Sequence, residues 1–293
     1  MKLITLVILI TMATLTNYAT GQNTNSLPDL RKNILQLISK TEGSFGVAFK
    51  NLENGDTLFI NKHEYFHAAS TMKTPVMLEV FRQIEKKKFK LSDSILVKNE
   101  FKSILDNSIF SLSLGDDSDD ILYKKLGQKV VLHDLIYDMM TVSSNLATNI
   151  LIDLVDAKNV MKNLQNLGIK ENLVLRGVED KKAFEAGLNN RTTPFGLLQV
   201  FEHIATNQMK NKVMMDILFA QKFNEIIPAK LPKNTKVAHK TGSITGVQHD
   251  SGIVFLPDGR KYILILLSKN LKNIEEGVKT LSEISKVIFE HLN

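Results

Sequence analysis

A serine and a lysine three residues apart, in the stretch AASTMKTP (68–75), form a pair that could perform nucleophilic chemistry. Ser70 opens a run with helical spacing, and residues three apart on a helix share a face. The Lys73 amine could therefore accept the proton of the Ser70 hydroxyl, and the helix start offers backbone N–H groups to a developing oxyanion. Taken alone, the pair also has a simpler interpretation, because serine is a common N-cap and this spacing arises by chance.

Two later stretches carry polar side chains that could act on the same substrate. Ser143 and Asn145 flank Ser144 between two runs with helical spacing, where a turn with capping serines is the simpler interpretation. The stretch KTG (240–242) ends a strand-like run and combines a cation, a hydroxyl and a residue that permits close backbone approach. A charged strand end is the ordinary explanation, so neither stretch identifies a site by itself.

The order of the three motifs is more specific than any one of them. S-x-x-K, S-x-N and K-T-G resemble the three elements of the serine β-lactamase and penicillin-binding protein superfamily, which are S-x-x-K, S-D-N and K-T-G. The likeness is strongest to class A β-lactamases and their serine-hydrolase relatives, and it covers nearly the whole chain after its first 21 residues. It implies an α/β (α+β) fold in which helices flank a five-stranded antiparallel sheet and an all-helical subdomain is inserted.

The resemblance implies catalytic roles for three side chains. Ser70 would be the acylated nucleophile, and Lys73 would be the base or proton shuttle. Ser143 would pass a proton to the leaving nitrogen. The backbone N–H groups of Ser70 and Ser243 would form the oxyanion hole.

The resemblance also implies how a substrate would be held. Asn145 would bind the amide of the substrate side chain, and Lys240 would tune Ser143 electrostatically. Thr241 and Ser243 would bind the substrate carboxylate. One departure is that Ser144 stands where the S-D-N element has aspartate, so an expected structural carboxylate is missing.

A water-activating glutamate is the ambiguous part of the resemblance. Glu179 lies 36 residues after Ser143 (179 − 143), which fits the family's spacing, although Ala183 stands where the family's E-x-x-L-N pattern has asparagine. Glu185 matches that pattern by letters, yet the loop that follows it is much shorter than in class A enzymes. We favour Glu179 as the base for deacylation. The alternative is that neither glutamate activates water, and that both are solvated or pair with nearby arginines.

Two stretches imitate metal sites. HEYFH (63–67) fits the zinc-protease pattern, but that chemistry needs both histidines on one helical face, and this stretch lies between a strand and the helix at Ser70. SLGDDSDD (113–120) is acidic but lacks the glycine and terminal glutamate of a calcium loop, so we expect an exposed loop. We therefore expect no metal and no cofactor.

Strand and helix patterns place these motifs in a fold. Alternating runs on either side of an Asn-Gly predict a β-hairpin near residues 44–61, and residues 27–43 before it have helical spacing. Three strand-like runs and an amphipathic helix end the chain, and residues of about 90–220 are mostly helical. We expect one catalytic domain (22–293), with its α/β part at about 22–66 and 222–293 and its helical part at about 67–221.

The first 21 residues have the pattern of an export signal. Lys2 precedes an apolar run that is too short for a comfortable membrane span, and Ala19-Thr20-Gly21 offers small residues at a cleavage site. We expect a periplasmic or secreted protein that begins at Gln22. An uncleaved anchor is the alternative.

Composition narrows the remaining classes. The sequence has no cysteine, which excludes disulfides, lipidated cysteine and thiolate metal ligands. Its net charge of +6 comes with no basic stripe interleaved with aromatic residues, so we expect no nucleic-acid partner.

The leading hypothesis is therefore an exported, metal-independent β-lactamase that acts as a monomer on a small β-lactam or related acyl substrate. The alternatives are a D,D-peptidase or an esterase-type acyl hydrolase on the same site, and a sensor that binds β-lactams without turnover.

Overall fold

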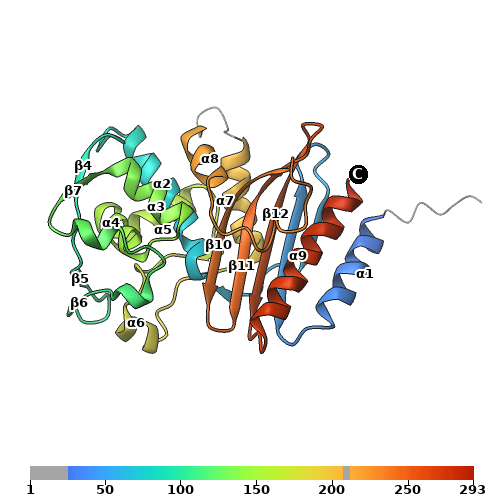
Figure 1. Ribbon diagram of the computed structural model, residues 1–293, viewed down its shortest axis with the longest axis horizontal. Coiled ribbons are helices and arrows are strands. Elements are labelled where there is room, and N and C mark those ends of the chain that lie inside the picture. The colour runs from blue at the N-terminus through green and yellow to red at the C-terminus, as the bar shows by residue number, and fades with distance from the viewer. Residues whose placement is uncertain (1–25, 207–211) are drawn as a thin grey trace, which may run out of the picture.

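A five-stranded antiparallel sheet joins the two ends of the chain (Figure 1). The computed structural model describes residues 26–206 and 212–293. The strand order is β10-β11-β12-β1-β2. The first two strands of the chain therefore lie next to its last three strands in one sheet. The strands are β1 (Ser44–Asn51), β2 (Thr57–Ile60), β10 (Lys236–Ile244), β11 (Val247–Phe255) and β12 (Lys261–Lys269). The predicted α+β fold with this sheet is confirmed.

β1 pairs with β2 on one side and with β12 on the other. Gly55 adopts a φ of 81° in the turn between β1 and β2, where a glycine is needed, and the predicted hairpin forms there. β12 pairs with β1 along its length, from Ser44 opposite Lys269 to Asn51 opposite Tyr262. This long register ties the last third of the chain to its first strands.

The two faces of the sheet bury separate apolar cores. α1 (Leu27–Ile38) and α9 (Ile274–His291) lie side by side on one face, where Ile34 and Phe45 are buried (Figure 1). α7 (Pro194–Thr206) packs on the other face. That second core continues into the helical block, so the sheet and the helices around the site share one set of packed side chains.

The helical block lies beside β10 and carries most of the remaining elements (Figure 1). Its helices are α2 (Lys73–Glu85), α3 (Leu132–Thr141), α4 (Asn145–Val155), α5 (Ala157–Asn166), α6 (Lys181–Glu185) and α8 (Lys212–Phe219). Three 3₁₀ turns are η1 (Ala69–Met72), η2 (Leu114–Asp116) and η3 (Leu122–Lys125). Short strands are β3 (Phe66–His67), β4 (Ser94–Leu96), β5 (Phe101–Lys102), β6 (Ile109–Phe110), β7 (Lys129–Val131), β8 (Asn172–Leu173) and β9 (Arg191–Thr192).

Some sequence-based boundaries differ or stay predictions. The helix expected to open at Ser70 begins at Lys73, because residues 69–72 form the tighter turn η1. The division into an α/β part and a helical part at residues 67 and 221 stays a prediction, and α7 within that span packs on the sheet. The predicted export signal (1–21) and start at Gln22 lie outside the described residues. Among the described helices, none is long and apolar enough to cross a membrane.

Candidate active site

Ser70 lies in the turn η1, directly before α2. Ala69 adopts a φ of 45°, which is unusual for a residue with a side chain and costs about 1–3 kcal/mol. Neighbouring bonds hold this conformation: the Ala69 N–H donates to His67 Nδ1 at 3.0 Å, and the Thr71 hydroxyl donates to the Ala68 carbonyl at 2.6 Å. The backbone is therefore fixed on both sides of the candidate nucleophile.

Lys73 joins the first motif to the second. Its side chain is fully buried, and its amine donates to the Ser143 carbonyl at 2.7 Å and to the Ser143 hydroxyl at 3.1 Å. A third bond, of 2.9 Å, goes to Asn145 Oδ1. S-x-x-K and S-x-N are 70 residues apart in the chain, and this amine brings them together.

Burial lowers the pKa of Lys73 into a range useful for acid–base chemistry. Loss of solvent lowers the pKa of the Lys73 amine to about 7, against the opposing effect of the Asp117 and Glu179 carboxylates, which raise it. At neutral pH a large fraction of the amine is therefore unprotonated. Such an amine can accept a proton from a nearby hydroxyl.

Lys240 reaches the same hydroxyl from the sheet. Its buried amine donates to Ser143 Oγ at 3.1 Å and to the Thr241 carbonyl at 2.9 Å. Burial, and then the Lys73 charge, lower the pKa of Lys240 well below its usual value, while Asp250 raises it. The Ser143 hydroxyl thus lies between two amines that disfavour each other's charge.

Gly242 lets the K-T-G strand approach Ser70. A Cβ atom at Gly242 would lie 3.1 Å from the backbone nitrogens of Ser70 and Thr71, closer than ordinary van der Waals contact. β10 packs against η1 at this point. The absence of a side chain at Gly242 is therefore a direct condition for the three motifs to meet.

Another segment supplies the carboxylate missing from the S-x-N motif. Ser144 caps α4, since its hydroxyl accepts from the Ala147 N–H at 3.3 Å. The Asp117 carboxylate accepts from the Asn145 and Leu146 N–H groups, both at 2.8 Å. A carboxylate at a helix N-terminus is favoured by its free N–H groups and by the helix dipole. Sequence reasoning missed this residue.

The acidic loop is held against the site rather than wholly solvated. The Tyr123 hydroxyl donates to Asp117 at 3.1 Å, and the Asn145 side-chain amide donates to the Asp116 carbonyl at 2.7 Å. The Ser118 hydroxyl donates to the Val142 carbonyl at 2.5 Å. The replacement at residue 144 hinted at a carboxylate from elsewhere, but nothing in the sequence indicated which one.

Arg176 and Asn149 pin the loop that carries Glu179. The Arg176 guanidinium donates to the Leu188 carbonyl at 2.9 Å and to Asn189 Oδ1 at 3.0 Å. The Asn149 side chain bonds both backbone groups of Val178, at 2.7 Å and 2.9 Å. The residue before Glu179 is therefore fixed to α4, the helix that begins at Asn145.

The two candidate glutamates differ in environment. Glu179 is half-buried with a φ of 59°, and burial, followed by the Asp116 charge, raises the pKa of its carboxyl. The charges of Glu179 and Lys73 act on each other, so the two groups share one electrostatic environment. Glu185 lies exposed at the end of α6.

An open cleft of about 830 Å³ runs past these groups. Ser70, Ser143, Asn145, Thr241 and Ser243 all line it, so the structure brings five of the eight predicted site residues to one surface. The buried amines of Lys73 and Lys240 stand behind that surface and contact its Ser143. Further parts of its lining come from residues 223–230 and from the first half of α9.

The residues of the zinc-protease pattern are directed to separate partners. His63 bonds Glu171 at 2.9 Å, Glu64 forms an ion pair with Lys269 at 2.7 Å, and His67 accepts from the backbone of η1. Within residues 26–206 and 212–293, no group of three or more His, Cys, Asp or Glu could hold a metal ion.

Comparison with known proteins identifies the family. Residues 29–292 match the β-lactamase enzyme family. The chain belongs to this family. A β-lactamase from Bacteroides uniformis is 27% identical over 296 residues, which cover 93% of this chain and 94% of that protein. The predicted membership in the serine β-lactamase and penicillin-binding protein superfamily is confirmed.

Solved structures agree with the fold of the β-lactamase family. A β-lactamase from Chitinophaga pinensis superposes with a TM-score of 0.79 at 24% identity, covering 90% of this chain and all (100%) of that one. The protein PBP-A superposes with a TM-score of 0.77 at 24% identity, covering 90% and 96%. At these identities the likeness shows the fold alone.

Proposed function

We propose that this protein is an exported serine hydrolase that opens β-lactam rings through an acyl-enzyme on Ser70. The observation that carries the proposal is the position of the Ser143 hydroxyl, 3.1 Å from both the Lys73 and the Lys240 amines. Two buried amines around one hydroxyl make a proton relay, since their mutual repulsion keeps them from both being charged. Membership in the β-lactamase family supports the substrate class.

Acylation follows from this relay. The unprotonated Lys73 amine accepts the Ser70 proton as Ser70 Oγ bonds to the lactam carbonyl carbon. The backbone N–H groups of Ser70 and Ser243 stabilise the oxyanion. When the C–N bond breaks, the Ser143 hydroxyl gives its proton to the ring nitrogen, and the Lys73 ammonium restores the Ser143 proton. Lys73 ends the step unprotonated, and the opened ring is an ester of Ser70.

Substrate binding uses the remaining motif residues. Asn145 holds the side-chain amide of the substrate, and Thr241 and Ser243 bind its carboxylate. Lys240, whose amine donates to Ser143 Oγ at 3.1 Å, tunes the electrostatic environment of that hydroxyl. No cofactor or metal takes part in the proposed reaction, and the protein acts as a monomer on a small molecule.

Deacylation needs a water and a base within reach of the ester. We assign the base to Glu179, because it shares an electrostatic environment with Lys73 and its loop is pinned to α4. Glu185 is exposed at the end of α6 and has no such support. A deprotonated Glu179 takes one proton from the water as the water oxygen attacks the ester carbon. When the bond from that carbon to Ser70 Oγ breaks, Glu179 returns this proton to Ser70 Oγ, so the step leaves a free acid product, an intact Ser70 hydroxyl and a deprotonated Glu179.

Intact-protein mass spectrometry tests the acyl-enzyme. A penicillin added to the parent protein should increase its mass by the mass of one penicillin, and Ser70→Ala should show no increase. Ser118→Ala is a matched control, since Ser118 also lines the cleft but has no assigned chemical role. An adduct that forms at the parental rate in Ser70→Ala would end the assignment.

A second candidate function rests on the altered glutamate loop. Glu179 lacks the asparagine of E-x-x-L-N, and its pKa is raised, which weakens it as a carboxylate base at low pH. Without a competent base, the same site would be a D,D-peptidase, an esterase-type acyl hydrolase or a β-lactam sensor. A chromogenic cephalosporin separates these: repeated turnover supports the β-lactamase, and a single stoichiometric burst supports the others.

Export belongs to the same proposal. It depends on the apolar run and the small residues Ala19-Thr20-Gly21 of the sequence. Mass analysis of the protein from the periplasmic or culture fraction should give a chain that begins at Gln22. An intact Met1 in that fraction would contradict the cleavage.

A further inference from the structure

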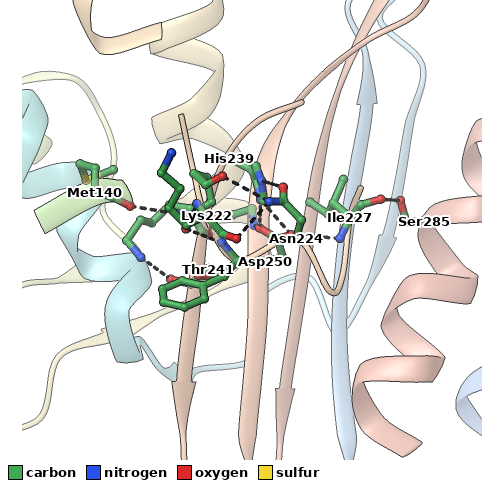
Figure 2. Close-up of polar contacts among 12 residues, drawn as sticks. Met140, Lys222, Asn224, Ile227, His239, Thr241, Asp250 and Ser285 are labelled. Atoms are coloured by element: carbon green, nitrogen blue, oxygen red, sulfur yellow. Dashed lines mark hydrogen bonds and ion pairs between the residues drawn. The ribbon is translucent and has the colours of Figure 1, made fainter. Parts of the chain in front are cut away.

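A buried histidine next to the K-T-G lysine has no part in the proposed reaction. His239 is 2% exposed, and its Nδ1 lies 2.9 Å and 3.1 Å from the two carboxylate oxygens of Asp250, which is fully buried. Its Nε2 lies 3.2 Å from Asn224 Oδ1. Figure 2 shows His239 between these two side chains, with further hydrogen bonds leading toward Ser285 and toward Met140.

The orientation of Asn224 shows that both ring nitrogens face acceptors. Asn224 Nδ2 donates to the carbonyls of Gln221 at 3.3 Å and Lys222 at 3.1 Å, so a flipped amide would set oxygen against oxygen. Asp250 in turn accepts from the Ile227 N–H at 3.0 Å, as an ionised carboxylate does. Only a doubly protonated imidazole can donate to both neighbours.

The segment 221–227 connects this charge pair to the catalytic groups. The Gln221 side chain donates to the Met140 carbonyl at 2.8 Å, and the Lys222 N–H donates to the Thr141 carbonyl at 3.1 Å. Met140 and Thr141 end α3, three and two residues before Ser143. The same segment forms part of the cleft wall through Phe223 and Ile226.

We propose that His239 is a positioning residue that, as an imidazolium between Asp250 and Asn224, clamps segment 221–227 to the sheet and to the end of α3. The clamp sets the part of the cleft wall that Phe223 and Ile226 form, and it supports the backbone that leads to Ser143. Its kinetic consequences rest on the proposed acyl-transfer function, whereas the protonation and the clamp do not.

The charged groups around His239 identify the anion with which it pairs. Asp250 belongs to β11, Lys240 follows on β10, and segment 221–227 carries Lys222 and Glu225. α9 contributes the uncharged Ser285, whose hydroxyl donates to the Ile227 carbonyl at 2.8 Å. α8 also packs on β10, but its Lys212 and Asp216 pair with each other at the surface. The Asp250 carboxylate is thus the anion paired with His239.

Protonation can be read directly by long-range ¹H–¹⁵N correlation of histidine rings, with the His239 signals assigned by their loss in His239→Gln. We expect both His239 nitrogens to carry protons at neutral pH. A bare ring nitrogen at neutral pH would overturn the proposal. This reading uses the parent protein and needs no turnover.

The kinetic test uses three variants. His239→Gln cannot donate along both directions, and its KM should rise about tenfold with a smaller change in kcat, the scale of one hydrogen bond to a charged group. Asp250→Asn removes the anion that pairs with His239, so its KM should rise by a similar factor.

The double variant His239→Gln/Asp250→Asn is the matched control. Both proteins that carry Asp250→Asn change the charge near Lys240 equally, so adding His239→Gln to Asp250→Asn should change KM little if the two residues act through one contact. A further tenfold rise in KM on adding His239→Gln would overturn the proposal.

Hydrogen exchange separates failure of the clamp from failure of the proposed function. The Lys222 and Ile227 amides should lose protection in His239→Gln while strand β12 keeps its protection. If the parent protein reacts with no β-lactam, this measurement and the ring correlation still decide the clamp. Unchanged protection of both amides would contradict it even in an active enzyme.

Discussion

The Lys73 amine donates to both oxygens of Ser143, to the carbonyl at 2.7 Å and to the hydroxyl at 3.1 Å. The group that would accept the Ser70 proton therefore already contacts the group that would deliver a proton to the leaving nitrogen. A change in the protonation of Lys73 acts on both ends of the relay. The pH dependence of acylation should consequently report on this amine.

Acylation should have an acidic limb set by Lys73. Because only the unprotonated amine accepts a proton, and burial lowers the pKa of Lys73 to about 7, the rate should rise with pH through a midpoint near that value. Rapid-quench mass spectrometry with a penicillin measures it. Lys73→Ala should be slower by a factor of about 10² or more and should lose the limb. A parent rate that stays flat on both sides of neutrality would exclude Lys73 as the base.

Replacing Asp117 with asparagine should move that limb to lower pH. The Asp117 carboxylate raises the pKa of Lys73, so removing its charge leaves the amine unprotonated at lower pH. The maximal rate should also fall, since the asparagine amide can accept only one of the two N–H groups at the start of α4, and without a charge. A lower maximal rate alone could come from the lost hydrogen bonds of Asp117. A shift of the acylation limb to lower pH reports specifically on the charge of Asp117.

Asp116→Asn is the control for this shift. The Asp116 charge acts on the pKa of Glu179 and not on that of Lys73, so the acylation limb should stay in place. Equal shifts in both variants would show that the whole acidic loop, rather than Asp117, sets the amine.

Motifs and strands were predictable where neighbouring residues determine them. The Asn-Gly turn at Gly55 and the alternating runs of the last three strands predicted the sheet, because turn chemistry and period-2 patterns are local. The spacing from Ser70 to Lys73 and the K-T-G stretch likewise pointed to lysines that both contact Ser143 in the structure.

Contacts between distant segments were not predictable in the same way. Asp117 reaches α4 from 28 residues earlier in the chain, and one aspartate among several in an acidic loop carries no local mark of that contact. His239 and Asp250 meet because β10 and β11 pair in one register, which their separation of 11 residues does not disclose. Pairs of this kind depend on tertiary packing.

Gly242→Ala should slow acylation while largely preserving the fold. The new methyl group would press on the Ser70 and Thr71 backbone nitrogens at 3.1 Å, so β10 and η1 must separate by a few tenths of an ångström. Small misplacements of reacting groups are costly, and we expect a loss of about tenfold in acylation rate. Gly115→Ala is the control, since its nearest atom would lie 4.0 Å away. Parental rates in both variants would show that the close approach at Gly242 is not needed.

Glu179→Ala should separate acylation from deacylation. Removing the proposed base leaves Ser70, Lys73 and Ser143 in place, so the ester should form at nearly the parental rate and then persist. Turnover of a chromogenic cephalosporin should fall at least about 10²-fold, with an acyl-enzyme visible by mass spectrometry. The raised pKa of Glu179 also predicts a pH dependence. The carboxylate is the active form, so as pH falls the deacylation rate of the parent should drop at a higher pH than it would with an ordinary carboxyl group.

Glu185→Ala is the matched variant, since its exposed carboxylate at the end of α6 can be removed without opening the pinned part of the loop. It should turn over like the parent protein. If Glu185→Ala traps the ester and Glu179→Ala does not, the base has been assigned to the wrong glutamate. If neither variant traps it although the parent turns over, the base lies outside this loop, and Lys73 becomes the nearest candidate because its pKa of about 7 leaves an unprotonated amine beside Ser143.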